Sequence, residues 1–228
     1  MKYDTLLLDA DDTLLDFKRS EREALKKTLE SFGLPADENV ISTYSRINDG
    51  YWKALERCEV TKEELKTRRF ADLCTHFGFE KDPVAMARTY EGNLATMTFL
   101  LEGADVLCRE LSEKYRIYIV TNGIKDVQMG RLYGSGINGY FIKAFVSEEM
   151  GFEKPRVEYF EAVARNITDF DKSKTVIIGD SLSSDMKGGI NFGIDTCWYN
   201  PSGKPIPDGM ELTYVVTSFE EIREIFLK

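Results

Sequence analysis

The chain has 228 residues, of which 43% are hydrophobic and 30% are charged, a composition typical of a globular protein with a sizeable core. It carries 30 Lys and Arg residues against 39 Asp and Glu residues, and the formal net charge of −9 argues against a nucleic-acid polymer or a membrane surface as partner. The cysteines are scattered, Asp9 interrupts the apolar run near the N-terminus, and no stretch approaches the ~18 apolar residues of a membrane span, so we expect a cytoplasmic protein with reduced thiols.

The first predicted strand, residues 3–9, runs directly into a group of carboxylates. The stretch LLLDADDTLLD places Asp9, Asp11 and Asp12 just after three leucines, and Asp16 follows closely. Negative charges this close repel one another unless a cation lies between them. Asp9 and Asp11 are therefore candidates for a functional site. Asp12 is either part of that site or a solvated loop acid, and Asp16 is expected at the surface.

The segment that follows, residues 17–95, has a helical pattern throughout. Two pairs at capping-box spacing, Ser20 with Glu23 and Thr61 with Glu64, predict the starts of two helices. Apolar residues three and four apart give these helices one buried face. We expect four helices in this segment, at 20–33, near 37–57, at 61–78 and near 82–97. The first strand is thus followed by an all-helical insertion.

From about residue 100 to the C-terminus, short apolar runs alternate with helical segments. The runs are too apolar for a sheet with one face in water, so they favour a parallel sheet covered by helices on both sides. This order of elements predicts an α/β Rossmann-like doubly wound fold. We expect a core of residues 1–16 and 96–228 and a helical cap of residues 17–95. The remaining strands are expected at 115–121, 143–149, 175–180, 195–200 and 213–218, with helices at 104–114, up to Gly193, and from Ser218 with Glu221 at capping-box spacing.

Polar side chains follow four of the predicted strands. In an open parallel sheet, ligands bind in the crevice beyond the carboxyl ends of the strands, so side chains that are distant in sequence converge there. The candidates are Asp9 and Asp11 after the first strand, Thr121 and Asn122 after the second, Lys154 after the third, and Asp180 and Asp185 after the fourth.

These residue types suit the chemistry of a phosphate ester. Several carboxylates at one point can hold a hard divalent cation, and Mg²⁺ suits a partial cage of oxygen ligands completed by water and phosphate. We expect Thr121, Asn122 and Lys154 to bind the substrate phosphate. A carboxylate is a competent nucleophile toward phosphorus, and a second one can transfer the proton. The only histidine, His76, is expected at a helix end, so no Ser-His-Asp set is available.

The stretches DADDT, VTNG, GFEKP and GDSLSSD, in this order, resemble the four motifs of the haloacid dehalogenase (HAD) superfamily. The resemblance extends over nearly the whole chain and includes a helical cap after the first strand. It implies a phosphatase that works through an aspartyl-phosphate. It further implies these roles: Asp9 as nucleophile, Asp11 as general acid and base, Thr121 and Lys154 as phosphate-binding pair, and Mg²⁺ held by the Asp9 side chain, the Asp11 backbone carbonyl and Asp180, with Asp185 supporting the site.

Within that superfamily, the chain resembles the bacterial pyrimidine 5′-nucleotidase group. The stretches that carry this likeness are VSEEMGFEKP, SDMKGGINFGIDTCWYN and NDGYW. The likeness implies a small phosphorylated metabolite as substrate, a nucleoside 5′-monophosphate. In the cap, Asn48, Trp52 and Arg69 are candidates to face that substrate, with the ring stacked on a base and Arg69 reading a polar edge. The alternative is that Trp52 packs between cap helices.

Four other functions remain open at this point. The first is a phosphatase of the same family for phosphoglycolate or a sugar phosphate. A haloacid dehalogenase is disfavoured because Asp11 supplies a proton donor that carbon–halogen cleavage does not require. A phosphomutase would need the phosphoryl group to outlast attack by water. A non-catalytic phospho-receiver combines Asp, Thr and Lys in the same way, but it is usually shorter, has no cap and carries its acceptor on a later strand.

Overall fold

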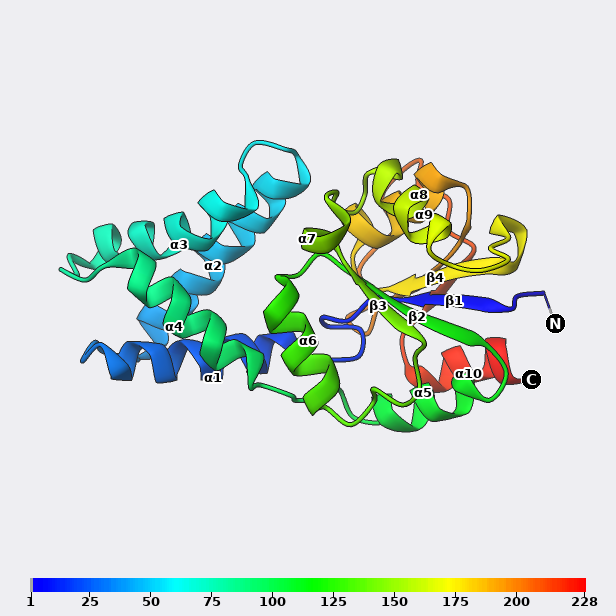
Figure 1. Cartoon of the computed structure of the whole chain (residues 1–228), viewed down its shortest axis with the longest axis horizontal. Coiled ribbons are helices and arrows are strands. Elements are labelled where there is room, and N and C mark those ends of the chain that lie inside the picture. Colours follow the sequence, from blue (N-terminus) through cyan, green and yellow to red (C-terminus); the bar gives the residue numbers. More distant parts are fainter. Residues whose placement is uncertain (1) are drawn as a thin grey trace. The chain divides into compact units, whose positions relative to one another are not determined.

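The computed structural model describes residues 2–228, and these form two compact units (Figure 1). We call residues 2–16 with Leu100–Lys228 the sheet unit, and Phe17–Phe99 the helical unit. The chain leaves the sheet unit after its first strand and returns to it at Leu100. The boundary expected after residue 95 thus lies at Phe99 in the structure, because a short connection follows the last helix of the insertion. Residue 1 of the expected core lies outside the described residues.

The sheet unit contains a six-stranded sheet in which every neighbouring pair of strands is parallel. The spatial order is β3-β2-β1-β4-β5-β6, so the first strand lies in the middle and the order reverses beside it. This confirms the α/β doubly wound fold. The strands are β1 (Thr5–Leu8), β2 (Arg116–Thr121), β3 (Lys143–Val146), β4 (Thr175–Gly179), β5 (Asp195–Tyr199) and β6 (Tyr214–Val216).

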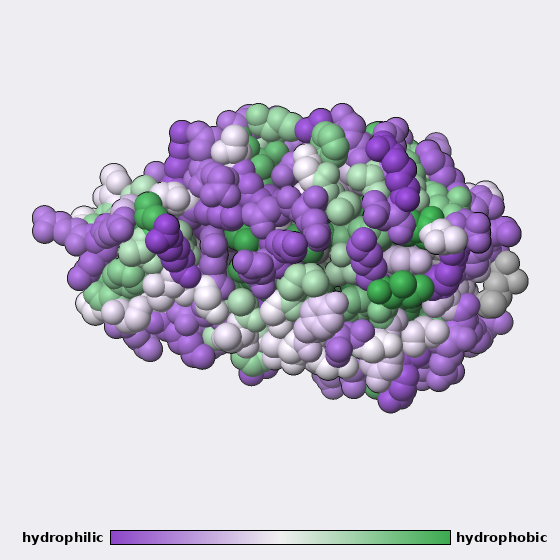
Figure 2. Space-filling view, viewed as in Figure 1, coloured by the Kyte–Doolittle hydropathy of each residue, from purple (hydrophilic) through white to green (hydrophobic). Residues whose placement is uncertain are grey.

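Helices cover both faces of this sheet. Because alternate strand residues point to opposite faces, Leu6 and Leu8 enter one apolar cluster and Leu7 enters the other. Both faces are therefore dry, which explains why the strands are almost uninterrupted apolar runs. The surface drawn in Figure 2, by contrast, is largely hydrophilic. The helices are α5 (Ala104–Ser112), α6 (Lys125–Gly134), α7 (Ser147–Met150), α8 (Val157–Arg165), α9 (Lys187–Phe192) and α10 (Phe219–Leu227).

The helical unit consists of four helices, as the pattern of its sequence predicts. They are α1 (Phe17–Ser31), α2 (Glu38–Glu56), α3 (Lys62–Phe77) and α4 (Pro83–Ala95). The helix α1 packs against α4, and α2 packs against α3. The rings of Tyr44, Phe70 and Tyr90 meet in the interior with centroids 5.0 to 5.4 Å apart. No helix within residues 2–228 combines the length and the apolar character that crossing a bilayer requires.

The three capping boxes predicted from the sequence have different outcomes. At Thr61 both hydrogen bonds form, because its side chain accepts from the Glu64 N–H while Glu64 accepts from the backbone of Thr61. The box at Ser20 is wrong, since α1 begins earlier and buries this residue within the helix. Ser218 caps α10 and its side chain accepts from the Glu221 N–H. The Glu221 carboxylate, however, accepts from the backbone N–H of Thr217 rather than from that of Ser218, so only half of this box forms.

A chain of buried polar side chains crosses the interior of the helical unit. The Glu21 carboxylate accepts hydrogen bonds from the Ser45 hydroxyl and, at 2.7 Å, from the Asn48 amide. The Asn48 carbonyl accepts in turn from Arg69 Nη1 at 2.9 Å, and this guanidinium lies 4.9 Å from the centre of the Tyr90 ring. Burial raises the pKa of Glu21. These contacts join α1, α2 and α3 through groups that have little access to water.

We predict that Arg69→Met destabilises the helical unit. Arg69 is 2% exposed, so its loss leaves the Asn48 carbonyl buried without its donor. We expect the free energy of unfolding to fall by about 3 kcal/mol, as for other broken buried polar pairs. Urea denaturation followed by circular dichroism measures the change. The exposed Arg88 on α4 provides a matched control, and Arg88→Met should change stability by no more than about 0.5 kcal/mol. Unchanged stability with a raised KM for a phosphate ester would instead assign Arg69 to the substrate.

Candidate active site

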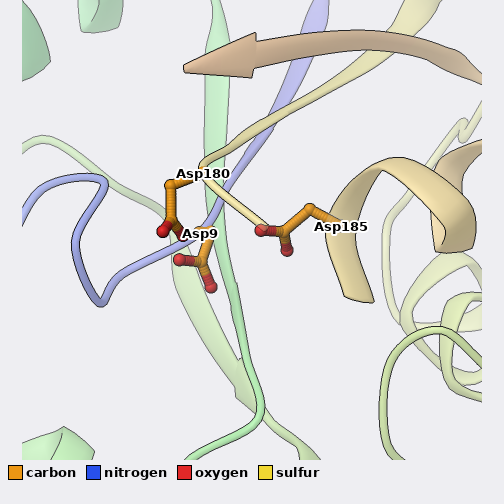
Figure 3. A group of neighbouring side chains, drawn as sticks. All are labelled: Asp9, Asp180 and Asp185. Atoms are coloured by element: carbon orange, nitrogen blue, oxygen red, sulfur yellow. The ribbon is translucent and has the colours of Figure 1, made fainter. Parts of the chain in front are cut away.

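Three carboxylates converge at the carboxyl ends of β1 and β4. Asp9 follows β1, Asp180 follows β4, and Asp185 lies in η2 (Leu182–Met186), a single turn of π-helix. Because β1 and β4 are neighbouring parallel strands, their carboxyl ends open on the same edge of the sheet. Each carboxylate offers an oxygen that lies within 4.8 Å of the other two. Figure 3 shows the three side chains directed toward one another.

Lys154 neutralises part of this charge from inside the protein. Its Nζ lies 2.7 Å from Asp9 Oδ1 and 2.6 Å from Asp185 Oδ1, and it also donates to the Val120 carbonyl at 2.8 Å. Burial acts to lower the pKa of Lys154, but the charges of Asp185 and Asp9 raise it above its ordinary value. The ammonium group is therefore a fixed positive charge. Its three donors are all used within the sheet unit.

The negative charge at this site exceeds what one lysine offsets. Burial and the neighbouring Asp185 raise the pKa of Asp9 to about 7, although Lys154 acts in the opposite direction. Burial and the charge of Asp9 raise the pKa of Asp180 to about 9. Among the described residues, none donates a hydrogen bond to the Asp180 carboxylate. The excess negative charge of these three carboxylates would favour a further cation, and their hard oxygen donors fit Mg²⁺.

Asp180 is positioned through its backbone. Its carbonyl accepts a hydrogen bond from the indole Nε1 of Trp198 at 2.8 Å, and its N–H donates to the Thr13 hydroxyl at 3.1 Å. The same hydroxyl donates to Asp9 Oδ2 at 3.2 Å, so Thr13 links the ends of β1 and β4. The sequence pattern alone assigns no specific role to Thr13 or Trp198. A buried Trp on a strand reads as core, and only the structure shows where its N–H points.

Asp185 is bound through both of its oxygens. Oδ1 pairs with Lys154, and Oδ2 accepts from the Ser181 N–H at 3.1 Å. A Cβ at Gly179 would lie only 2.3 Å from Asp185 Oδ2, so this glycine is required for space. Asp185 thus holds the Lys154 ammonium group and the Ser181 N–H in place. Its role in supporting a metal site stays a prediction.

Thr121 and Asn122 occupy the end of β2. The Thr121 hydroxyl oxygen accepts from Gln128 Nε2 at 2.7 Å, which leaves its hydrogen for another acceptor. The Asn122 amide makes two hydrogen bonds with the backbone of Lys154, donating to its carbonyl at 2.8 Å and accepting from its N–H at 2.7 Å. The Asn122 side chain therefore holds the loop that carries Lys154. Its contact with a substrate phosphate stays a prediction.

Asp11 contacts two residues that sequence reasoning missed. Its oxygens accept hydrogen bonds from Arg131 Nη1 and, at 2.7 Å, from Gln128 Nε2. Both donors lie on α6 and are buried. The only signal in the sequence is that Gln128 and Arg131 are three apart, hence on one face of the helix that follows VTNG. Asp12 has φ 56°, in the left-handed region, and its N–H donates to the Leu15 carbonyl at 2.8 Å.

The candidate substrate contacts of the helical unit lie in two kinds of environment. Asn48 and Arg69 are buried and bound to one another, as described above. Trp52, on α2, is half-buried. The expectation that these three residues face a substrate stays a prediction, as does the alternative that Trp52 packs between helices. His76 lies exposed near the end of α3, as expected.

Two curated proteins are similar to nearly the whole chain. The pyrimidine 5′-nucleotidase PynA of Streptococcus pneumoniae is 40% identical over 223 residues, which cover 97% of this chain and 94% of that protein. The pyrimidine 5′-nucleotidase YjjG of Escherichia coli is 28% identical over 228 residues, which cover 100% of both.

A solved structure and a family model agree with this similarity. The crystal structure of YfnB from Bacillus subtilis, bound to magnesium, matches with a TM-score of 0.94 at 39% identity and covers 99% of each chain. The model of the haloacid dehalogenase-like hydrolases matches residues 3–193. With this match and the parallel sheet that gathers the four motifs at one edge, the chain is a hydrolase that belongs to the haloacid dehalogenase-like family.

Proposed function

We propose that this protein is a Mg²⁺-dependent phosphomonoester hydrolase that acts through an aspartyl-phosphate, with a nucleoside 5′-monophosphate as substrate. One observation supports the chemistry most. At the carboxyl end of β1, the Asp9 carboxylate lies 2.7 Å from the Lys154 ammonium group and within 4.8 Å of oxygens of Asp180 and Asp185. Two relatives named pyrimidine 5′-nucleotidases support the substrate class.

The residues at the strand ends fit a magnesium ion. The Asp9 side chain, the Asp11 backbone carbonyl and Asp180 are the proposed ligands, while Asp185 keeps its bond to Lys154. When bound, the ion offsets the charge of the phosphate. A carboxylate ~4 Å from a dianionic phosphate otherwise meets a repulsion of roughly 8 kcal/mol at an effective dielectric constant of ~20.

The side chains then divide the work of two displacements. In the first, a carboxylate oxygen of Asp9 bonds to phosphorus while the bond to the leaving oxygen breaks, and Asp11 gives a proton to that oxygen. In the second, water attacks phosphorus, Asp11 takes its proton, and the Asp9 carboxylate is released with inorganic phosphate. The Thr121 hydroxyl, whose hydrogen is available, holds a phosphate oxygen in both steps. For Lys154 to hold another, its ammonium group would have to exchange one of its three present acceptors for the phosphate.

We further propose that the helical unit is the cap that sets selectivity for the leaving group. Caps of this kind exclude water during the first displacement. Trp52 is the candidate for stacking on a base, because it is half-buried and aromatic. Asn48 and Arg69 would have to exchange their present partners for groups of the substrate.

We predict that Asp9→Asn abolishes turnover, because the neutral amide is a poor nucleophile toward phosphorus. Phosphate release from UMP with Mg²⁺ should fall by at least ~10³-fold, while the circular dichroism spectrum stays that of the wild type. The exposed Asp208 in the sheet unit provides a matched Asp→Asn control, which should keep full activity. Activity of Asp9→Asn close to the wild-type value would show that another group attacks phosphorus.

We predict that Mg²⁺ stabilises the protein in the absence of substrate. At a concentration ~100-fold above its Kd, a ligand of the folded state adds about 2.7 kcal/mol of stability, which appears as a raised Tm. Asp180→Asn should remove this rise, and Asp208→Asn should keep it.

We also predict how the affinity for Mg²⁺ changes with pH. Because the pKa of Asp180 is raised to about 9 without metal, binding must release its proton. Affinity should therefore increase from pH 6.5 to pH 9, and calorimetry in buffers of different ionisation enthalpy counts the protons. A metal-independent Tm, or an affinity that falls with pH, would contradict the assigned ligands.

A substrate panel tests the leaving group. We predict a higher kcat/KM for UMP and dUMP than for phosphoglycolate or a sugar phosphate, measured as phosphate release with Mg²⁺ present. An equal or higher value for phosphoglycolate would assign the protein to the other phosphatases of the family. Absence of metal-dependent release from every ester, including p-nitrophenyl phosphate, would favour a non-catalytic phospho-receiver.

A further inference from the structure

The helix α6 directs two buried polar side chains at Asp11. Gln128 is 1% exposed and Arg131 is 0% exposed, and they lie one helical turn apart. We propose that Gln128 and Arg131 are positioning residues that hold the Asp11 carboxyl group in the orientation needed for proton transfer. This inference rests on the proposed function, in which Asp11 is the general acid and base.

The contacts of these two side chains reach both oxygens of the Asp11 carboxyl group. Gln128 Nε2 donates to Asp11 Oδ2 and to Thr121 Oγ1, both at 2.7 Å. Arg131 Nη1 donates to Asp11 Oδ1 and, at 3.1 Å, to Gln128 Oε1. Both oxygens of Asp11 thus accept from α6. Gln128 also ties Asp11 to Thr121, the residue proposed to bind the phosphate.

Stability alone does not account for this arrangement. Placing a guanidinium in the interior has a desolvation cost of several kcal/mol, and apolar residues of similar size are often equally stable or more stable at such positions. Leu at position 128 and Met at position 131 would fill similar volumes without that cost. The role of this polar pair is therefore to orient Asp11, because hydrogen bonds to both oxygens fix the plane of its carboxylate.

The glycine of VTNG provides an independent observation. A Cβ at Gly123 would lie 2.1 Å from Gln128 Cγ, so no other residue leaves room for this side chain. Gly123 is absent from the glycines with positive φ, which means that space rather than backbone conformation requires it. Gly123, which directly follows the proposed phosphate-binding residues, thus provides the space that the Gln128 side chain occupies.

The geometry leaves Asp11 able to react. Each carboxyl oxygen has two lone-pair positions, and the hydrogen bonds from Gln128 and Arg131 occupy one on each oxygen. A remaining position carries the proton. In the first displacement, the Asp11 O–H bond breaks as the leaving oxygen takes the proton and the electron pair of its bond to phosphorus. In the second, the same position accepts a proton from the attacking water.

The test compares two aryl esters of similar size that differ in their need for a proton. Phenyl phosphate has a poor leaving group that requires protonation, whereas p-nitrophenyl phosphate has a good one that leaves as the anion. The kcat/KM for each, with Mg²⁺, reports the steps up to departure of the phenol. Since general acid catalysis contributes roughly 10²–10⁴-fold, we expect Arg131→Met and Gln128→Leu to lose ~10–100-fold on phenyl phosphate and several-fold less on p-nitrophenyl phosphate.

A double-mutant cycle separates positioning from a general structural effect. In an Asp11→Asn background, Arg131→Met and Gln128→Leu should cause little further loss, because the group they orient no longer transfers a proton. Arg223→Met is the matched control and should leave both rates unchanged, because it removes only a partly exposed ion pair, 2.7 Å long, between Arg223 on α10 and Glu110 on α5. Equal losses on the two esters, or full additivity with Asp11→Asn, would overturn the inference.

Two further outcomes are decided separately. If Arg131→Met does not fold, the ratio of losses for Gln128→Leu and Gly123→Ala decides the inference by the same criterion. If the wild type hydrolyses neither aryl ester but releases phosphate from UMP, the proposed function stands, and if it does not act on UMP either, the proposed function fails. In both cases the inference depends on the crystal structure of Gln128→Leu, in which a reoriented Asp11 carboxyl group supports positioning and an unchanged one contradicts it.

Discussion

The candidate site depends on one buried ammonium group, that of Lys154, placed between Asp9 and Asp185. Removing one partner of such a buried pair costs about 3–5 kcal/mol, because a charge is left uncompensated away from water. The neighbouring sequence is arranged around this contact: Gly179 leaves space for the Asp185 carboxylate, and Asn122 binds the backbone of Lys154 through both ends of its amide. A single interaction thus connects the ends of β1, β2 and β4.

The Lys154 ammonium group does not neutralise the site, because one positive charge faces the carboxylates of Asp9, Asp180 and Asp185. Burial first, and then the neighbouring carboxylates, raise the pKa values of Asp9 and Asp180, which favours the neutral acids. Well-packed apolar residues at such positions are often as stable or more stable, and the proposed Mg²⁺ would offset the excess negative charge. The apolar clusters on both faces of the sheet provide stability that this charged edge does not.

The sequence predicted the doubly wound fold because its strands are nearly uninterrupted apolar runs, and it predicted Asp9, Lys154, Asp180 and Asp185 as neighbours because each follows such a run. Side-chain direction is harder to predict. A capping-box pattern at Ser20 does not show that the helix starts a turn earlier. Contacts between residues distant in the sequence are equally hard to predict. The hydrogen bond from the Trp198 indole to the Asp180 carbonyl is an example, because no local pattern encodes it.

The register of α6 matters for the same reason. Gln128 and Arg131 reach Asp11 because residues three apart share one face of a helix. Shifting the helix by one residue would rotate that face by about 100° and withdraw both donors at once. The Gln128 side chain occupies the space that a Cβ at Gly123 would need, and this packing favours the observed register. Packing at the end of β2 is thus linked to the Asp11 carboxyl group at the end of β1, through a side chain that also contacts Thr121, the residue proposed to bind phosphate.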